Sequence, residues 1–246
     1  ALPLSTSLDS IGPLAASLRC CTLTDAVLAG APPRLPLEQP VAGARLGVPE
    51  TVVLDGLDAA VAAAFERTLS RLSAAGARLT RLALPEFAEF AALHARGSLA
   101  AAESWAWHRE LLATRAAEYD ARVVSRMRAG EQMGAADYID LLAARRRWIE
   151  QVEARVAGFD ALVLPTVPVL APRIDELEAS DQAFFAANGR ILRNPALINF
   201  LDGCALSLPC HEPGAAPVGL MLAAPAGADL RLLGLGLGVE RLLARD

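Results

Sequence analysis

The chain has 246 residues, 54% of them hydrophobic and 5% aromatic, so it can bury a sizeable core built mainly from aliphatic side chains. Its formal net charge of −5 argues against a nucleic-acid-binding surface, and no apolar run reaches the roughly 18–20 residues of a membrane span. All 23 basic residues are arginine, which excludes any mechanism that needs a lysine base from this chain alone.

Up to residue 84, the pattern predicts one helix and then a strand–helix–strand unit. A helix is expected over 14–28, and the four prolines within 30–40 indicate a connector that cannot be helical. Residues 45–48 predict a short strand, 58–74 an amphipathic helix, and 78–84 the next strand. Two strands joined by a helix favour a parallel pair with a right-handed crossover.

The middle of the chain predicts helices without a convincing strand, and the last third returns to strands. Three helices are expected in the middle, at residues 86–112, 116–127 and 135–156. The last third predicts strands at 160–164, 205–208 and 218–222, followed by a closing helix over 229–243. Together these elements predict an α/β fold.

No local motif offers a convincing catalytic or metal site. The cysteines form no Cys-x-x-Cys pair, and we interpret them as small hydrophobic residues in a reducing, cytoplasmic compartment: Cys20, Cys21, Cys204 and Cys210. Cys210 and His211 are neighbours whose side chains would point to opposite faces of a strand, which argues against a Cys–His dyad. The glycines 234, 236 and 238 imitate a dinucleotide fingerprint inside a helical pattern. We therefore expect no metal ion and no cofactor.

Four stretches of the chain, in order, resemble the motifs of the amidase signature family. They are residues 5–15 (STSLDSIGPLA), 159–172 (FDALVLPTVPVLAP), 193–209 (RNPALINFLDGCALSLP) and 217–222 (PVGLML). Each stretch is short, but their order and separations span the chain. Cys204 stands where the family usually has proline, and Met221 where it usually has glutamine. We expect these two departures to alter the packing of a pocket and to leave the fold unchanged.

The resemblance implies a three-layer α/β/α fold in which one large mixed sheet is covered by helices. It implies that residues 1–246 form a single domain, the C-terminal portion of an amidase signature domain, with a helical insert over about 86–156 that shapes the substrate pocket. It also implies hydrolysis of a carboxylic amide C–N bond. In the family, a serine attacks the amide with a second serine and a lysine as base, and all three precede the opening motif. We therefore expect a truncated chain, without catalytic residues and inactive alone.

Four side chains are candidates for contact with a substrate. Thr166 and Asn199 would, by resemblance, lie near the reaction centre, where α/β proteins tend to place ligands. The distinctive side chains of the helical insert are Trp105, Trp107 and His108, of which Trp105 and His108 are the candidates. For the aromatic residues, packing of a helix onto the sheet is the competing interpretation.

The expected partners are a small-molecule amide and further polypeptide, without nucleic acid or membrane. Unpaired strand edges favour either a homodimer or association with the missing N-terminal segment. Two alternatives stay open beside the amidase interpretation. The chain could be a non-catalytic binding or interaction module that keeps a remnant of the fold, or one half of a split amidase or amidotransferase.

Overall fold

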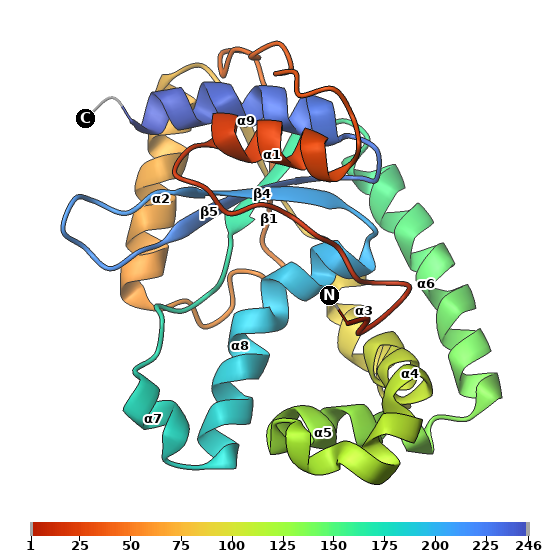
Figure 1. The fold of residues 1–246 in the computed structure, drawn as a ribbon. Helices are drawn as coiled ribbons and strands as arrows, with labels where there is room; N and C mark the ends of the chain where they lie inside the picture. The colour runs from red at the N-terminus through yellow and green to blue at the C-terminus, as the bar shows by residue number, and fades with distance from the viewer. Residues whose placement is uncertain (1, 245–246) are drawn as a thin grey trace. The chain divides into compact units, whose positions relative to one another are not determined.

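The computed structural model describes residues 2–244, which divide into two compact units (Figure 1). The helical unit comprises the chain up to Ile11 together with Ala88–Gln151, and the sheet unit comprises Gly12–Phe87 and the chain from Val152 onward. The expectation of a single domain over 1–246 stays a prediction. Among the described residues, no helix has both the length and the apolar character needed to cross a bilayer.

The sheet unit is built on five strands: β1 (Arg45–Pro49), β2 (Arg78–Leu82), β3 (Ala161–Pro165), β4 (Cys204–Pro209) and β5 (Gly219–Ala224). Their order across the sheet is β2-β1-β3-β5-β4. β1 pairs in parallel with β2 and β3, whereas β5 pairs antiparallel with β3 and β4. The predicted mixed sheet of an α/β fold is therefore confirmed. All five residues of β3 are buried, as expected for a central strand.

The strand–helix–strand unit is also as predicted. α2 (Ala59–Ala74) joins β1 to β2, and its apolar face buries Val61, Phe65, Leu69 and Leu72. Gly76, just beyond the helix, adopts a φ of +92°, a left-handed conformation that glycine takes without steric penalty. The chain can therefore reverse there and enter β2 in parallel with β1.

Three helices share one hydrophobic core with the sheet: α1 (Leu18–Leu28), α2 and α9 (Asp229–Leu243). The glycines of α9 allow the proline-rich connector, residues 30–40, to pack closely against the helix. A Cβ on Gly234 would lie 2.5 Å from the Leu37 carbonyl oxygen, and one on Gly238 would lie 2.2 Å from that of Gln39. The Gln39 N–H also donates to the Gly234 carbonyl at 2.9 Å. The glycine spacing thus serves chain packing, as its helical context indicated.

Two helices of the sheet unit escaped the sequence reasoning: α7 (Ile174–Glu178) and α8 (Asp181–Phe200). α8 begins with a cap, because the Ser180 hydroxyl accepts the Ala183 N–H at 3.1 Å. Pro195 lies inside the helix, where proline removes a hydrogen-bond donor and normally argues against helical structure. The surrounding apolar packing, with Leu197, Ile198 and Phe200 buried, outweighs this local penalty.

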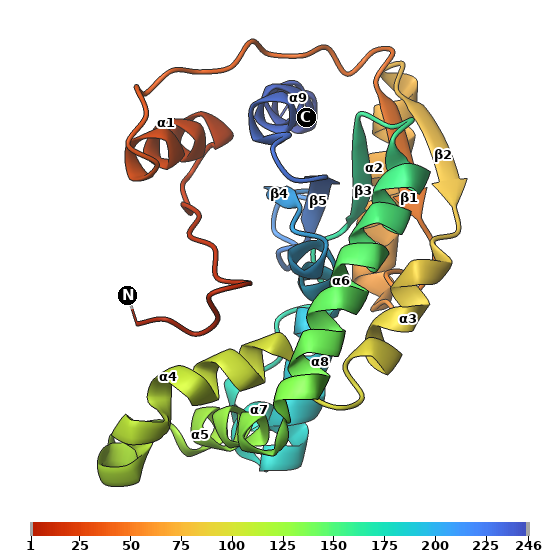
Figure 2. The same ribbon diagram turned by 90° about the vertical axis from the view of Figure 1, so that its right-hand side faces the viewer.

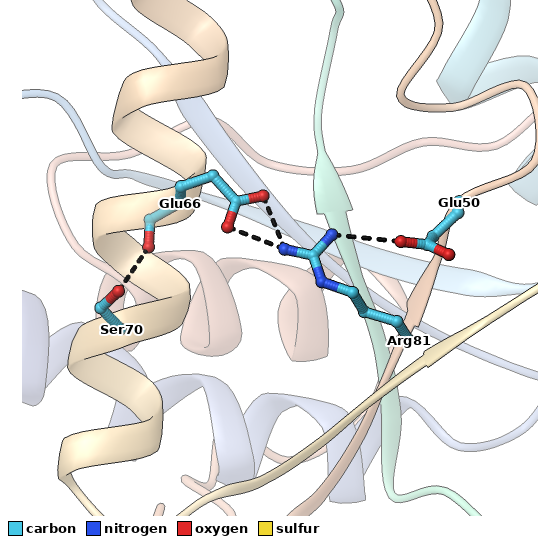
Figure 3. Close-up of polar contacts among 4 residues, drawn as sticks. All are labelled: Glu50, Glu66, Ser70 and Arg81. Atoms are coloured by element: carbon cyan, nitrogen blue, oxygen red, sulfur yellow. Dashed lines mark hydrogen bonds and ion pairs between the residues drawn. The ribbon is translucent and has the colours of Figure 1, made fainter.

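The edge strand β2 carries charged side chains. Arg81 of β2 donates to both carboxylate oxygens of Glu66 on α2, at 2.7 and 2.8 Å, and to Glu50 at 3.3 Å (Figure 3). Ser70, one turn beyond Glu66, donates its hydroxyl to the Glu66 carbonyl. Charged edges of this kind disfavour pairing with another strand.

The opposite edge strand, β4, is uncharged. Its burial alternates, and the residues of one face are exposed: Ala205, Ser207 and Pro209. The two edges of the sheet therefore differ in their capacity to accept a further strand.

The helical unit takes most of its residues from α3 (Pro85–Leu93), α4 (Leu99–Arg115), α5 (Ala121–Arg128) and α6 (Ala135–Val156), with short 3₁₀ turns η1 (Ala116–Glu118) and η2 (Ala129–Gln132). The single helix expected over 86–112 is divided into α3 and α4. Gly97 has a φ of +131°, and the Ser98 hydroxyl then caps α4 by accepting the Ala101 N–H. α4 packs against α5 and η2 (Figure 2).

Candidate functional site

Thr166 follows β3 directly and forms a pair of hydroxyls with Ser207 of β4. Their oxygens are 2.6 Å apart, and the Thr166 N–H donates to the Gly219 carbonyl at 2.9 Å. A Cβ on Gly219 would lie 2.6 Å from the Ser207 hydroxyl and 2.7 Å from that of Thr166. Gly219 therefore leaves the space that the hydroxyl pair occupies. Ser207 is exposed, so the pair can offer a donor and an acceptor to a ligand.

Asn194 of α8 ties the end of β3 to the turn after β1. Its side chain is fully buried, and its amide nitrogen donates to the carbonyls of Pro165, at 2.9 Å, and Val53, at 3.2 Å. Because Pro165 immediately precedes Thr166, these contacts fix the backbone that carries the Thr166 hydroxyl. In the sequence, Asn194 stands within one of the family motifs, and no local pattern there indicates these contacts.

Arg193 holds the same turn from the neighbouring position. Its guanidinium donates to the carbonyls of Asp55, at 2.7 Å, and Val53, at 3.1 Å, and to the Asn194 side-chain oxygen, at 3.1 Å. Burial lowers the pKa of the Arg193 guanidinium from its usual value, and the nearby Asp55 carboxylate opposes that effect. The turn includes Val52 at a φ of +67°, a conformation that a β-branched residue rarely adopts without outside restraint.

Asn199, the second candidate of the sheet unit, lies in the last turn of α8. It is half-buried, and its backbone carbonyl accepts the Asp202 N–H at 3.1 Å. Its contact with a substrate stays a prediction, as does that of Thr166.

A cavity of about 620 Å³ lies within the helical unit. Its volume falls within the range of roughly 300–1,000 Å³ typical of small-molecule sites. Its lining includes two indoles, two further apolar groups, one phenol, one carboxylate and one guanidinium: Trp105, Trp107, Leu4, Met133, Tyr138, Glu103 and Arg109. Trp105 therefore lines a cavity, and its contact with a substrate stays a prediction.

The close approach of η2 to α4 shapes one part of this cavity. Gly130 of η2 is buried and lines the cavity, and a Cβ there would lie 2.0 Å from the Ala101 carbonyl oxygen. No side chain can be accommodated at that distance, because the clashing atom belongs to a helix backbone. Gly97 lies against the Met133 side chain, and a Cβ on Gly97 would be 3.0 Å from the Met133 sulfur.

Glu103 is the carboxylate of the cavity wall, and it accepts four hydrogen bonds. The donors are the hydroxyl of Ser5 at 2.6 Å, the backbone N–H and hydroxyl of Ser7 at 2.9 and 2.5 Å, and the hydroxyl of Tyr138 at 2.7 Å. Burial alone would raise the pKa of Glu103, but these four bonds outweigh it and hold the pKa below its usual value. The group is therefore an anion that organises the structure around it.

His108, on the same helix, is 2% exposed and does not line the cavity. Its Nε2 lies 2.9 Å from the Pro3 carbonyl oxygen, which can only accept, so Nε2 carries the proton. Nδ1 lies 3.0 Å from the Tyr119 hydroxyl oxygen, within hydrogen-bonding distance. Both ring nitrogens have partners within the protein, so direct contact between His108 and a substrate stays a prediction.

The chain matches the family model described as Amidase over residues 1–233. It is 33% identical to the 2-amino-5-chloromuconic acid deaminase of Comamonas testosteroni over 99% of its own length and 53% of that protein. It is 29% identical to the mandelamide hydrolase of Pseudomonas putida, over 99% of the chain and 52% of that enzyme.

A solved amidase structure superposes with a TM-score of 0.82 at 30% identity, covering 99% of this chain and 55% of the other. The chain thus spans about half the length of the curated relatives it matches. With the family model matched over most of the sequence and the fold shared, the chain belongs to the amidase family.

Proposed function

We propose that the chain serves in the hydrolysis of the C–N bond of a small carboxylic amide, and that it supplies binding surface for the substrate. The observation that carries this proposal is the family match over residues 1–233. The names of several relatives, among them an amidase and a mandelamide hydrolase of Pseudomonas putida, support amide substrates as a class.

We further propose that residues 1–246 do not turn over an amide by themselves. Attack by a serine hydroxyl needs an adjacent base, and the family resemblance assigns that role to a lysine through a second serine. The sequence contains no lysine, so the base would have to come from other polypeptide. The chain's own contribution is then to bind and orient the substrate.

In this proposal, the candidate residues have separate tasks. The hydroxyl pair of Thr166 and Ser207 offers hydrogen bonds to polar atoms of a ligand, with Asn199 as a further polar candidate. Trp105 provides apolar surface in the cavity of the helical unit. His108 does not line that cavity but is hydrogen-bonded to Pro3, which does.

We propose that the edge of β4 associates with a second polypeptide strand or with a second copy of the chain. The uncharged, exposed residues of β4 support this, because unpaired edges without charge readily accept another strand. The charged edge of β2 is the poorer candidate. The family includes relatives named as a subunit of an amidotransferase, which favours a split enzyme as the second candidate function.

A chimaera separates these possibilities. In it, residues 1–246 replace the aligned half of the Comamonas testosteroni relative, and ammonia release from phenylacetamide and mandelamide is compared with that of the chain alone. We expect release by the chimaera and none by the chain. A folded chimaera that releases ammonia neither from these two amides nor from 2-amino-5-chloromuconic acid, which the parent relative is named for deaminating, would favour the non-catalytic binding module.

A further inference from the structure

The segment Pro3–Ser7 contains no helix or strand, yet it forms part of the cavity wall in the helical unit. Pro3, Leu4 and Thr6 all line the cavity. An irregular segment of this kind would move freely unless its side chains or backbone were fixed by contacts elsewhere. Two polar residues of α4, Glu103 and His108, supply those contacts.

The first anchor is the Glu103 carboxylate. Within the Pro3–Ser7 segment it accepts the Ser5 hydroxyl and both the backbone N–H and the hydroxyl of Ser7, and from α6 it accepts the Tyr138 hydroxyl. Ser5 is 2% exposed, so a wrongly placed segment would leave its hydroxyl buried without a partner. Hydrogen bonds to an ionised acceptor are stronger than bonds between neutral groups.

The second anchor is His108, which donates from Nε2 to the Pro3 carbonyl, while its Nδ1 is hydrogen-bonded to the Tyr119 hydroxyl. His108 is hydrogen-bonded to the start of the segment, at Pro3, and Glu103 to its end, at Ser5 and Ser7. Between them lies Leu4, which is exposed and lines the cavity. The anchors therefore fix the positions of the segment's cavity-lining side chains. His108 does so without lining the cavity itself.

We propose that the cavity binds the aromatic end of a carboxylic amide, and that Glu103 and His108 are positioning residues that set its affinity by holding Pro3–Ser7 in place as the wall. The two indoles, Met133 and Leu4 favour an aromatic group over a short aliphatic one. A preformed wall binds more tightly than one that must be ordered when the ligand arrives. The proposal rests on the proposed function only for the amide as ligand class.

The test uses the chain of residues 1–246, phenylacetamide as probe and acetamide as the comparison without a ring. Two of the three tryptophans, Trp105 and Trp107, line the cavity, so ligand binding should change the intrinsic fluorescence. We expect saturable quenching by phenylacetamide and none by acetamide. Absence of saturable binding by phenylacetamide at millimolar concentration would overturn the proposal.

Variants then test the anchors. Glu103→Gln should weaken phenylacetamide binding about tenfold or more, because the acceptor loses its charge and an NH2 group replaces the oxygen that accepts the Ser7 and Tyr138 hydroxyls. Glu110→Gln, at an exposed position of the same helix, is the matched control and should leave binding unchanged. Tyr138→Phe keeps the ring and removes one donor, so a loss of about threefold to tenfold is expected. His108→Phe should also weaken binding.

The dissociation constants are measured well below each variant's unfolding temperature, which is recorded alongside. A folded Glu103→Gln protein that binds as tightly as Glu110→Gln would overturn the positioning role. Should Glu103→Gln fail to fold, Tyr138→Phe with unchanged affinity would overturn it equally. The binding readout needs no turnover, so a failure here is distinct from a failure of the proposed amide hydrolysis.

Discussion

Replacing Asn194 by alanine should destabilise the sheet unit substantially. The side chain is fully buried, donates to the carbonyls of Val53 and Pro165, and accepts from Arg193. Each buried hydrogen bond contributes about 0.5–1.5 kcal/mol net, so the loss of three amounts to about 2–4 kcal/mol. That is a large part of a typical native stability of about 5–15 kcal/mol.

For a protein of this size, such a loss lowers the unfolding midpoint by roughly 5–15 °C. Thermal unfolding followed by circular dichroism would measure it, with Asn188→Ala as control, since Asn188 lies in the same helix and is half-buried. Asn194→Asp keeps the shape but turns an acceptor toward two carbonyls, so it should be at least as harmful. If Asn194→Ala melted within about 2 °C of Asn188→Ala, the assigned role of Asn194 would be wrong.

Three further predictions follow from named contacts. Gly130→Ala should destabilise the helical unit by about 3 kcal/mol or more, because its Cβ would lie 2.0 Å from a helix carbonyl oxygen. Urea unfolding followed by tryptophan fluorescence would measure the loss. Gly158→Ala is the control, because a Cβ there meets no atom within 4 Å, and its stability should stay within about 0.5 kcal/mol of wild type. The pKa of Glu103 is lower in the folded protein than in the unfolded chain, where it is about 4.3, so the stabilisation it provides should be complete above that value and fade as pH falls through the folded pKa. The difference in urea midpoint between wild type and Glu103→Gln should therefore shrink in acid. A difference that does not depend on pH would refute this prediction. Ala205→Lys should reduce any self-association seen by light scattering, and an unchanged mass distribution would exclude the β4 edge.

Hydrophobic periodicity was enough to predict the elements whose burial is regular. The helices at 58–74, 135–156 and 229–243 and the central strand near 160–164 match α2, α6, α9 and β3 closely. In each, the apolar spacing agrees with the tertiary contacts. The parallel pairing of β1 and β2 followed from the same pattern and the intervening helix.

The elements that were missed or misplaced depend on contacts between distant parts of the chain. α8 contains Pro195, and its buried Asn194 makes sense only once Val53 and Pro165 lie beside it. The break between α3 and α4 follows from the Gly97 conformation, which a long helical pattern conceals. Local propensity favours the wrong outcome at Pro195, whereas Gly97 and the Ser98 cap favour the break that the long apolar pattern conceals.

The candidate sites show the same division between pattern and tertiary contact. Trp105 was identified as a distinctive side chain, and it lines a cavity. Glu103 carried no signal in the sequence, because its four donors come from Ser5, Ser7 and Tyr138, about 35 to 98 positions away. The alternation of Ser5 and Ser7 across Thr6 is the one local hint that two hydroxyls could face a common acceptor.

The most direct test of the account is an assay of ammonia release from phenylacetamide by the purified chain of residues 1–246, free of other polypeptides. We expect the chain to bind the amide without releasing ammonia above the uncatalysed background, because it has no lysine to activate a serine. Sustained turnover that co-purifies with the chain would contradict it and would require a base among the residues described here.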